Sequence, residues 1–336
     1  MDRSKPVILD HIMLKQKDKL LLKRVQGRTP KAFAKLYDKP RGLRVGKSKG
    51  VNSLFFKEMF KGLLSGQSTY TTYMNDHFTG KNKGDVVLPD YVRCIIKEMV
   101  SPNLPYYNEV VGSRLANLLK VDTVYNMAYQ IDPNDDIAPD DYDYLLSVDY
   151  LPDGYTDYSM SNIGIDFDID DSLEDIMTNV YRGLRRLNRT GKIGNDIDQF
   201  EQFGESFAKQ YLFRSLICED SDYCSRNVGF MVNKNGDYKL CPCFDMELLF
   251  QGKRCTDYYK ESAERDLLYL HKTMPDIVED FLNRCNWALQ RGEIDNVMTN
   301  SIKVEDRFSS RALVKNNISK LTAIYNKIKN SPEMEN

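Results

Sequence analysis

The segment from Val228 to Leu240 constrains the fold of this chain more than any other, because its residues are typical of a tight hairpin. Two short apolar runs, Val228–Val232 and Tyr238–Leu240, flank the sequence Asn-Lys-Asn-Gly-Asp at 233–237. An Asn-Gly pair between such runs favours a hairpin, because these residues accept the positive φ angles of a tight turn. The segment therefore predicts two antiparallel strands whose outer ends lie together.

Three polar residues flank the predicted hairpin at this shared end. Asp222 and Asn227 precede the first strand, and Asp245 follows the second. Asn227 and Asp245 can then share a cation, and magnesium prefers oxygen ligands of this kind. Phosphoryl transfer also needs a carboxylate at the attacking hydroxyl, a role open to Asp222. The alternative is ordinary turn chemistry, in which Asp and Asn are common.

A second group of residues lies upstream. The run from Tyr91 to Met99 predicts a strand that carries Lys97 near its end, and the apolar spacing from Glu109 to Leu119 predicts a helix. Strand character returns over 121–131, so strand, helix and strand predict a sheet packed by a helix. Lys97 is placed to contact phosphates with Glu109 beside it, although an ordinary lysine at a strand edge is the alternative.

The two groups together resemble the HipA-like serine/threonine kinase family. The downstream part is Leu216-Ile-Cys-Glu-Asp-Ser-Asp-Tyr-Cys-Ser-Arg-Asn-Val-Gly-Phe230 followed by Gly236-Asp-Tyr-Lys-Leu-Cys-Pro-Cys-Phe-Asp245. It is similar to the family pattern of Asp-x-His-x-x-Asn, a hydrophobic strand, a turn, and Leu-x-Pro-x-Tyr/Phe-Asp. Upstream, Cys94-Ile-Ile-Lys97 and Asn108-Glu109 are similar to the family's nucleotide lysine and helix glutamate. The resemblance covers roughly Tyr91 to Phe250.

This resemblance implies a fold, an activity and a role for each residue. The fold would be α+β and protein-kinase-like, with two lobes: a small sheet-containing N-lobe and a mainly helical C-lobe. The cofactors would be ATP and Mg²⁺, and the acceptor a Ser or Thr hydroxyl, most simply on a protein. Asp222 would be the catalytic base, Asn227 and Asp245 the metal ligands, and Lys97 the phosphate contact with Glu109 as its partner.

The sequence departs from the family pattern in two places. Cys224 occupies the position of the family's His, which removes a hydrogen-bonding ring from the catalytic loop. Neither Gly46-Lys-Ser-Lys-Gly50 nor Gly80-Lys-Asn-Lys-Gly84 matches a P-loop or a kinase glycine loop, although either could cradle phosphates with backbone amides. An inactive nucleotide-binding regulatory module, a pseudokinase, is therefore the alternative function.

Composition and periodicity predict three parts along the chain: a basic N-terminal extension over 1–67, the N-lobe over 68–135, and the C-lobe over 136–336 with the catalytic loop at 218–250. The predicted helices cover 53–64, 173–187 and 197–217, and further helices follow residue 258. Weak strand signals lie at 7–9 and 68–73, and an apolar run lies at 20–22.

Charge is unevenly distributed. Residues 1–67 hold 17 Lys or Arg against 5 Asp or Glu, and Phe33 and Tyr37 lie among them. This stretch could bind nucleic acid through phosphate contacts and stacking, or form a solvated surface. Residues 131–176 hold 15 acidic and no basic residues, so we expect them to be solvated, to bind cations or to face a basic partner.

The same composition suggests a location. We find no run of about 18 apolar residues and no secretory signal pattern, so we expect a cytoplasmic protein with no membrane partner. The seven cysteines are an odd number without a regular framework, which favours reduced thiols.

Overall fold

The computed structural model describes residues 7–9, 31–37, 91–98, 105–129, 144–152, 154–250, 256–300 and 307–331. Several predicted features lie outside these residues: the helix at 53–64, the strand at 68–73, the apolar run at 20–22, both glycine-containing loops, and most of the basic and part of the acidic stretch. The predicted strand at 7–9 is confirmed as β1 (Val7–Leu9).

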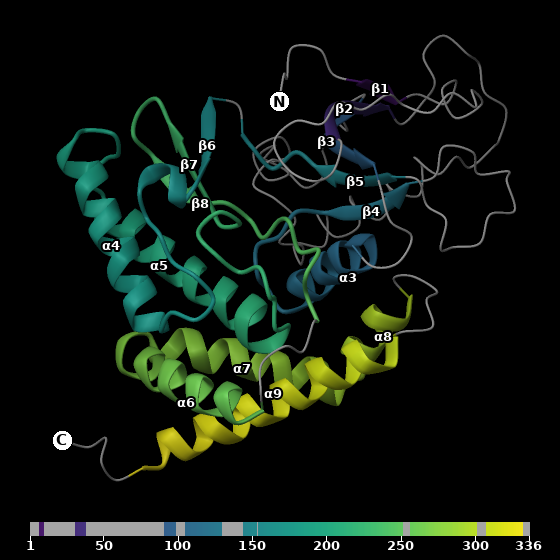
Figure 1. The fold of residues 1–336 in the computed structure, drawn as a ribbon, viewed down its shortest axis with the longest axis vertical. Coiled ribbons are helices and arrows are strands. Elements are labelled where there is room, and N and C mark those ends of the chain that lie inside the picture. The colour runs from purple at the N-terminus through teal and green to yellow at the C-terminus, as the bar shows by residue number, and fades with distance from the viewer. Residues whose placement is uncertain are drawn as a thin grey trace, which may run out of the picture.

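The first sheet has five strands in the order β1-β2-β3-β5-β4. Neighbouring strands are antiparallel except β1 and β2, which are parallel. The helix α3 contacts β4 and lies beside the sheet (Figure 1). The prediction of a sheet packed by a helix is confirmed, in elements with these bounds: β2 (Lys31–Tyr37), β3 (Tyr91–Glu98), α3 (Pro105–Leu118), β4 (Asn126–Tyr129) and β5 (Tyr144–Val148).

This sheet extends past both boundaries expected from composition. β1 and β2 precede residue 67, and β5 follows residue 135, yet β2 and β5 both pair with β3 of the expected N-lobe, and β1 pairs with β2. The composition shift near residue 135 marks the start of an acidic stretch, whereas hydrogen-bond pairing decides which strands share a sheet. The boundaries expected at residues 67 and 135 therefore do not coincide with the limits of the first sheet.

The second sheet contains the predicted hairpin. Its strands are β6 (Tyr155–Ser159), β7 (Gly229–Asn233) and β8 (Tyr238–Leu240), in that order and all antiparallel. Within the turn only Gly236 has a positive φ, of 88°, so the expectation of positive φ angles holds for the glycine alone. The Asn233 N–H donates to the Asp237 carbonyl and closes a three-residue loop with glycine last, a common hairpin form. The outer strand β6 was not predicted.

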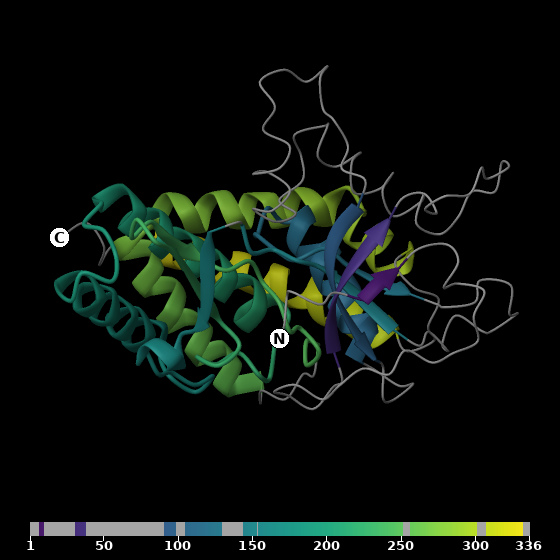
Figure 2. The ribbon, with the colours of Figure 1, turned by 90° about the horizontal axis from the view of Figure 1, so that it is seen from above.

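Helices form the rest of the described chain, and most of them lie on the side of the molecule away from the first sheet (Figures 1 and 2). The α+β class is confirmed: small sheets accompany a mostly helical body. The predicted helix at 197–217 divides into an α-helix and a π-helical turn, η3. The bounds are η2 (Ser161–Ile163), α4 (Leu173–Arg189), α5 (Ile197–Tyr211), η3 (Leu212–Ile217), α6 (Thr256–Thr273), α7 (Pro275–Gln290), α8 (Glu293–Asn300) and α9 (Arg307–Lys329).

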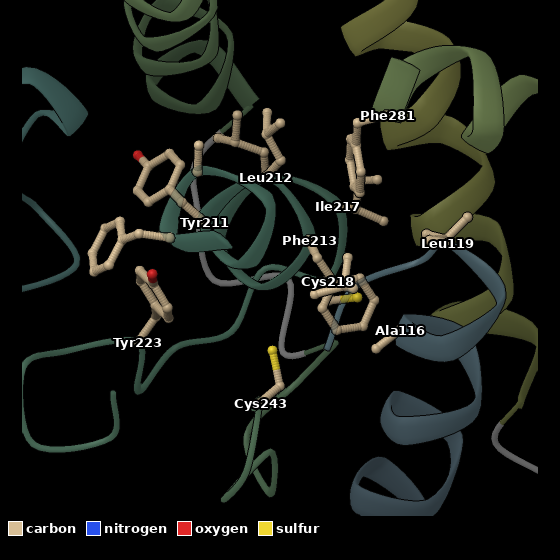
Figure 3. Close-up of a cluster of buried hydrophobic side chains, with 14 of the residues drawn as sticks. Ala116, Leu119, Tyr211, Leu212, Phe213, Ile217, Cys218, Tyr223, Cys243 and Phe281 are labelled. Atoms are coloured by element: carbon tan, nitrogen blue, oxygen red, sulfur yellow. The ribbon is translucent and has the colours of Figure 1, made fainter. Parts of the chain in front are cut away.

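A buried cluster joins the helices that position the polar residues of the two sheets (Figure 3). Phe213 and Ile217 of η3 are fully buried and meet side chains from the end of α3 and from Phe281 of α7. Burying an aromatic or branched side chain of this size contributes roughly 1.5–3 kcal/mol. The cluster therefore fixes α3, which carries Glu109, against the helix that leads into Asp222.

Two further observations concern the whole described chain. None of its helices is both long and apolar enough to cross a membrane. Its six described cysteines are buried free thiols: Cys94, Cys218, Cys224, Cys241, Cys243 and Cys285.

Candidate active site

Lys97 lies between two carboxylates that come from distant parts of the chain. Its Nζ is 2.7 Å from Glu109 Oε1 and 3.1 Å from Asp245 Oδ1. Glu109 is almost fully buried, whereas the side chain of Asp245 is 37% exposed. Burial acts to lower the pKa of Lys97, but the adjacent carboxylates of Glu109 and Asp245 outweigh it and raise the pKa above its usual value. The ammonium group therefore stays charged.

Regular structure holds both upstream residues in place. Lys97 belongs to β3, which pairs with β2 on one side and β5 on the other. Glu109 lies in α3, and its Oε2 accepts a hydrogen bond from Asn126 Nδ2 at 3.1 Å. The Glu109 carboxylate thus has one partner on β3 and one on β4, the two strands that flank β5, and these contacts fix its rotamer before any ligand arrives.

Asp245 has a backbone conformation that few non-glycine residues adopt. Its φ is 55°, in the left-handed region, where a side chain adds strain of order 1 kcal/mol. The segment before it is fixed, because the Val124 N–H donates to the Cys243 carbonyl at 3.0 Å and the Cys243 N–H donates to the Asp122 carbonyl at 2.8 Å. These bonds hold the segment before Asp245 against the residues between α3 and β4.

The segment after Asp245 is fastened to α3 as well. Asn108, the neighbour of Glu109, is buried, and its Nδ2 donates to the carbonyls of Glu247 at 2.7 Å and Leu249 at 3.0 Å. Bonds on both sides of Asp245 therefore maintain its strained backbone and its contact with Lys97.

Arg214, in the π-helical turn η3, connects Asp245 to the catalytic loop expected from the sequence. Its side chain is fully buried, and Nε donates to Asp220 Oδ2 at 2.6 Å. Nη1 donates to the carbonyls of Asn227 at 2.9 Å and Phe244 at 3.2 Å, and Nη2 donates to the Asp245 carbonyl at 3.3 Å. One guanidinium group thereby holds the backbones of both predicted metal ligands.

Asp222 and Asn227 bond to each other within the catalytic loop. Asn227 Nδ2 donates to Asp222 Oδ2 at 2.7 Å and to the Asp222 carbonyl at 3.0 Å. The Asp222 N–H donates to Asp220 Oδ1 at 3.1 Å, so the Asp220 carboxylate joins Arg214 to this loop. Cys224 Sγ lies 4.0 Å from Asp222 Oδ1, a long contact from a weak donor.

A cavity of about 260 Å³ opens beside Lys97. Its lining includes the charged residues Lys97, Glu109 and Asp245 and the aromatic residues Tyr150 and Phe244. The rings of Tyr150 and Phe244 are stacked, with centroids 5.7 Å apart and planes at 10°. Asp222 and Asn227 are not among the described residues that line this cavity, although Arg226 and Gly229 are, and Arg214 bonds the Asn227 backbone to that of Asp245.

The carboxylates around Lys97 form a cluster that could hold a metal ion. Glu109, Asp245 and Glu247 each place an oxygen within 4.8 Å of the others. A set of oxygen donors fits a hard cation such as magnesium, which carboxylates commonly bind together with the phosphates of a nucleotide.

The five residues proposed from the sequence thus fall into two bonded groups that share the Arg214 anchor: Lys97 with Glu109 and Asp245, and Asp222 with Asn227. Their roles in binding and catalysis stay predictions. Sequence reasoning missed Arg214, Asp220, Asn126 and Glu247. A sequence pattern predicts that an arginine in a helix is exposed, and no spacing rule indicates a guanidinium that binds two later loops.

Comparison with solved structures finds 21 similar chains, two of which are described below. No family model matches the sequence, and no curated protein matches it. The crystal structure of the proinflammatory kinase CtkA of Helicobacter pylori is 12% identical, with a TM-score of 0.45 over 73% of this chain and 93% of that chain. HipA of Shewanella oneidensis MR-1, solved with HipB and its operator DNA, is 12% identical, with a TM-score of 0.43 over 72% of this chain and 61% of that chain.

Proposed function

We propose that this chain is a magnesium-dependent kinase that transfers the γ-phosphoryl group of ATP to a Ser or Thr hydroxyl of a protein. The observation that carries the proposal is the contact of Lys97 with Glu109 and Asp245 in the lining of the cavity. A buried lysine held by a helix glutamate, and in reach of a second carboxylate, is the arrangement that positions phosphates in kinases.

The cavity suits the nucleotide in a definite orientation. The stacked rings of Tyr150 and Phe244 would contact the base, and the phosphates would lie at Lys97. Asp245 and the Oδ1 atom of Asn227 would hold magnesium, because Asn227 Nδ2 is engaged by Asp222. When bound, the ion neutralises charge on the phosphate oxygens.

The residues of the catalytic loop act on the acceptor. Asp222 accepts the proton of the acceptor hydroxyl as its oxygen forms a bond to the γ-phosphorus. The bond from that phosphorus to the oxygen bridging it to the β-phosphorus breaks, and ADP leaves. Asn227 orients the Asp222 carboxylate through Nδ2. Arg214 holds the catalytic loop and Asp245 in fixed positions relative to each other. Most of the rate enhancement comes from this positioning and from charge stabilisation.

The test is transfer from radiolabelled ATP to the chain itself and to a mixture of Ser- and Thr-containing peptides. We expect Asp222→Asn to lower the rate about 10²- to 10⁴-fold, because it removes the base. Asn227→Ala and Asp245→Asn should each lower it as well. Asp280→Asn makes the same chemical change on an exposed turn of α7 and should leave the rate unaltered. Full activity in Asp222→Asn would overturn the assignment.

Cys224 favours a second candidate function, a regulatory module that binds the nucleotide without turnover. Its Sγ lies 4.0 Å from Asp222 Oδ1, too far for a strong hydrogen bond, so the catalytic carboxylate lacks the ring donor of the family pattern. Calorimetry with ATP and magnesium, beside the transfer assay, separates the two functions. Binding without transfer, and a gain of transfer in Cys224→His, would identify the regulatory module.

Binding of nucleic acid by residues 1–67 stays a further proposal, tested by the dependence of that binding on salt concentration.

A further inference from the structure

A second cavity, of about 510 Å³, lies on the other face of the second sheet. Its apolar lining comes from β7, η2 and the end of α4, and includes Ile163, Leu187, Phe230 and Val232. Its charged lining residues are Arg186 and Lys192, and no carboxylate is among the described residues that line it. The cavity therefore combines an apolar floor with a positive rim.

The positive rim continues along the outer surface of α4. Five basic residues and no acidic residue occur between positions 182 and 192. All five are exposed, and none forms an ion pair with a carboxylate within the described ranges. We name these five the α4 basic patch: Arg182, Arg185, Arg186, Arg189 and Lys192.

Cations near the end of a helix also stabilise its dipole, which is the simplest reason for such residues. That effect is confined to the last turn, whereas Arg182 and Arg185 lie further back in α4. Arg186 is also held in place, because Nη2 donates to the carbonyls of Ile163 at 2.6 Å and Gly164 at 2.9 Å. These acceptors are neutral, so its charge stays available to an anionic partner.

The second cavity adjoins the candidate active site. Tyr158 and Asn162 line both cavities. The Ser161 N–H donates to the Ser225 carbonyl at 3.2 Å, so η2 is bonded to the loop that carries Asp222. A chain bound in the second cavity could therefore continue past η2 toward Asp222.

We propose that the second cavity is the binding site for the acceptor polypeptide, which inserts an apolar side chain against its floor and places acidic residues against the α4 basic patch. This inference rests on the proposed kinase function. The floor favours a polypeptide over nucleic acid, because Tyr158, 42% exposed, is the one exposed aromatic residue among its described lining residues and Phe230 is 1% exposed, whereas single-stranded nucleic acid stacks successive bases on aromatic side chains.

The experiment measures binding of a fluorescein-labelled peptide by anisotropy, without ATP. The probe has twelve residues with a central Ser, one Leu and four Glu, and a matched peptide has Lys in place of Glu. We expect the Glu peptide to bind more tightly, and Lys192→Glu to weaken it about fivefold to tenfold, since exposed charge pairs contribute modestly. Lys272→Glu makes the same change on the exposed surface of α6 and should leave binding within twofold.

A second variant tests the floor. Val232→Phe fills the cavity without changing charge, and we expect it to weaken the Leu peptide but not a peptide with Gly in place of Leu. Equal binding of the Glu and Lys peptides would overturn the proposal. So would tighter binding of a twelve-nucleotide uridine RNA that Lys192→Glu abolishes.

The peptide assay is separate from catalysis. Asp222→Asn should bind the Glu peptide like the wild type, because the second cavity does not include Asp222. Peptide binding that responds to Lys192→Glu and Val232→Phe in a chain that transfers no phosphate would overturn the kinase function and leave the polypeptide site standing.

Discussion

The free energy of burying the Lys97 ammonium group depends on its contact with the Glu109 carboxylate. Glu109 is 1% exposed and has no access to bulk water, so its carboxylate needs the charge of Lys97. Removing one partner of a buried pair costs about 3–5 kcal/mol, because the other charge is left uncompensated. The same contact that would position phosphates therefore also stabilises the fold.

We predict that Lys97→Met lowers the free energy of unfolding by about 3 kcal/mol, measured by urea denaturation. The double variant Lys97→Met with Glu109→Gln should recover more than half of this loss, because no unpaired charge stays buried. Phosphoryl transfer should stay lost in both. A double variant no more stable than the single one would contradict the pairing.

Lys97 should not titrate near neutral pH. The pKa of Lys97 is raised in the folded state, so its contribution to stability is complete below the unfolded pKa of about 10.4 and is lost only at higher pH. We predict that the difference in unfolding free energy between wild type and Lys97→Met is constant from pH 7 to 9. A decline of that difference within this range would show that Lys97 loses its proton earlier.

At the scale of elements, the β7–β8 hairpin depends on one glycine. Gly236 has a φ of 88°, and a Cβ there would lie 2.8 Å from the backbone nitrogen of Gly194. Gly154 has a similar φ of 84°, with nothing within 4 Å of such a Cβ. The two positions share the conformational strain and differ in the steric contact.

We predict that Gly154→Ala lowers the free energy of unfolding by about 1–2 kcal/mol, from positive φ alone. Gly236→Ala should cost clearly more, because the rigid backbone near Gly194 cannot move aside cheaply. Thermal or urea unfolding of both variants measures the difference. Equal losses would mean that the contact between the hairpin and the loop before α5 contributes nothing.

At the scale of the whole molecule, a nucleotide that bridges the first sheet and the catalytic loop should stabilise both. A ligand at one hundred times its Kd adds about 2.7 kcal/mol to the stability of the folded state. We predict that ATP with magnesium raises the Tm by several degrees, measured by calorimetry, and that EDTA reduces the shift. Asp245→Asn should abolish the magnesium-dependent part, and Asp280→Asn should retain it. An identical shift with EDTA would contradict a metal at Asp245.

The elements that the sequence predicted well are those whose signals are local. Helical periodicity identified α4 and the C-terminal helices, and the Asn-Gly pair identified the β7–β8 hairpin. These patterns succeed because a turn or an amphipathic helix depends on residues a few positions apart. The strand β6 gave no such signal, because its outer position beside β7 is set by pairing across about 70 residues.

The sequence by itself determined the chemistry available to this protein: a lysine on a strand, a glutamate on the next helix, and an Asp, Asn and Asp arranged around a hairpin. Tertiary structure decided which of them meet. Lys97 and Asp245 are 148 positions apart, and their contact depends on the bonds that Asn108 and Arg214 make to the Asp245 segment. Arg214 itself is buried because carbonyls from separate loops converge on it. Such convergence results from packing of the whole chain, which no local pattern encodes.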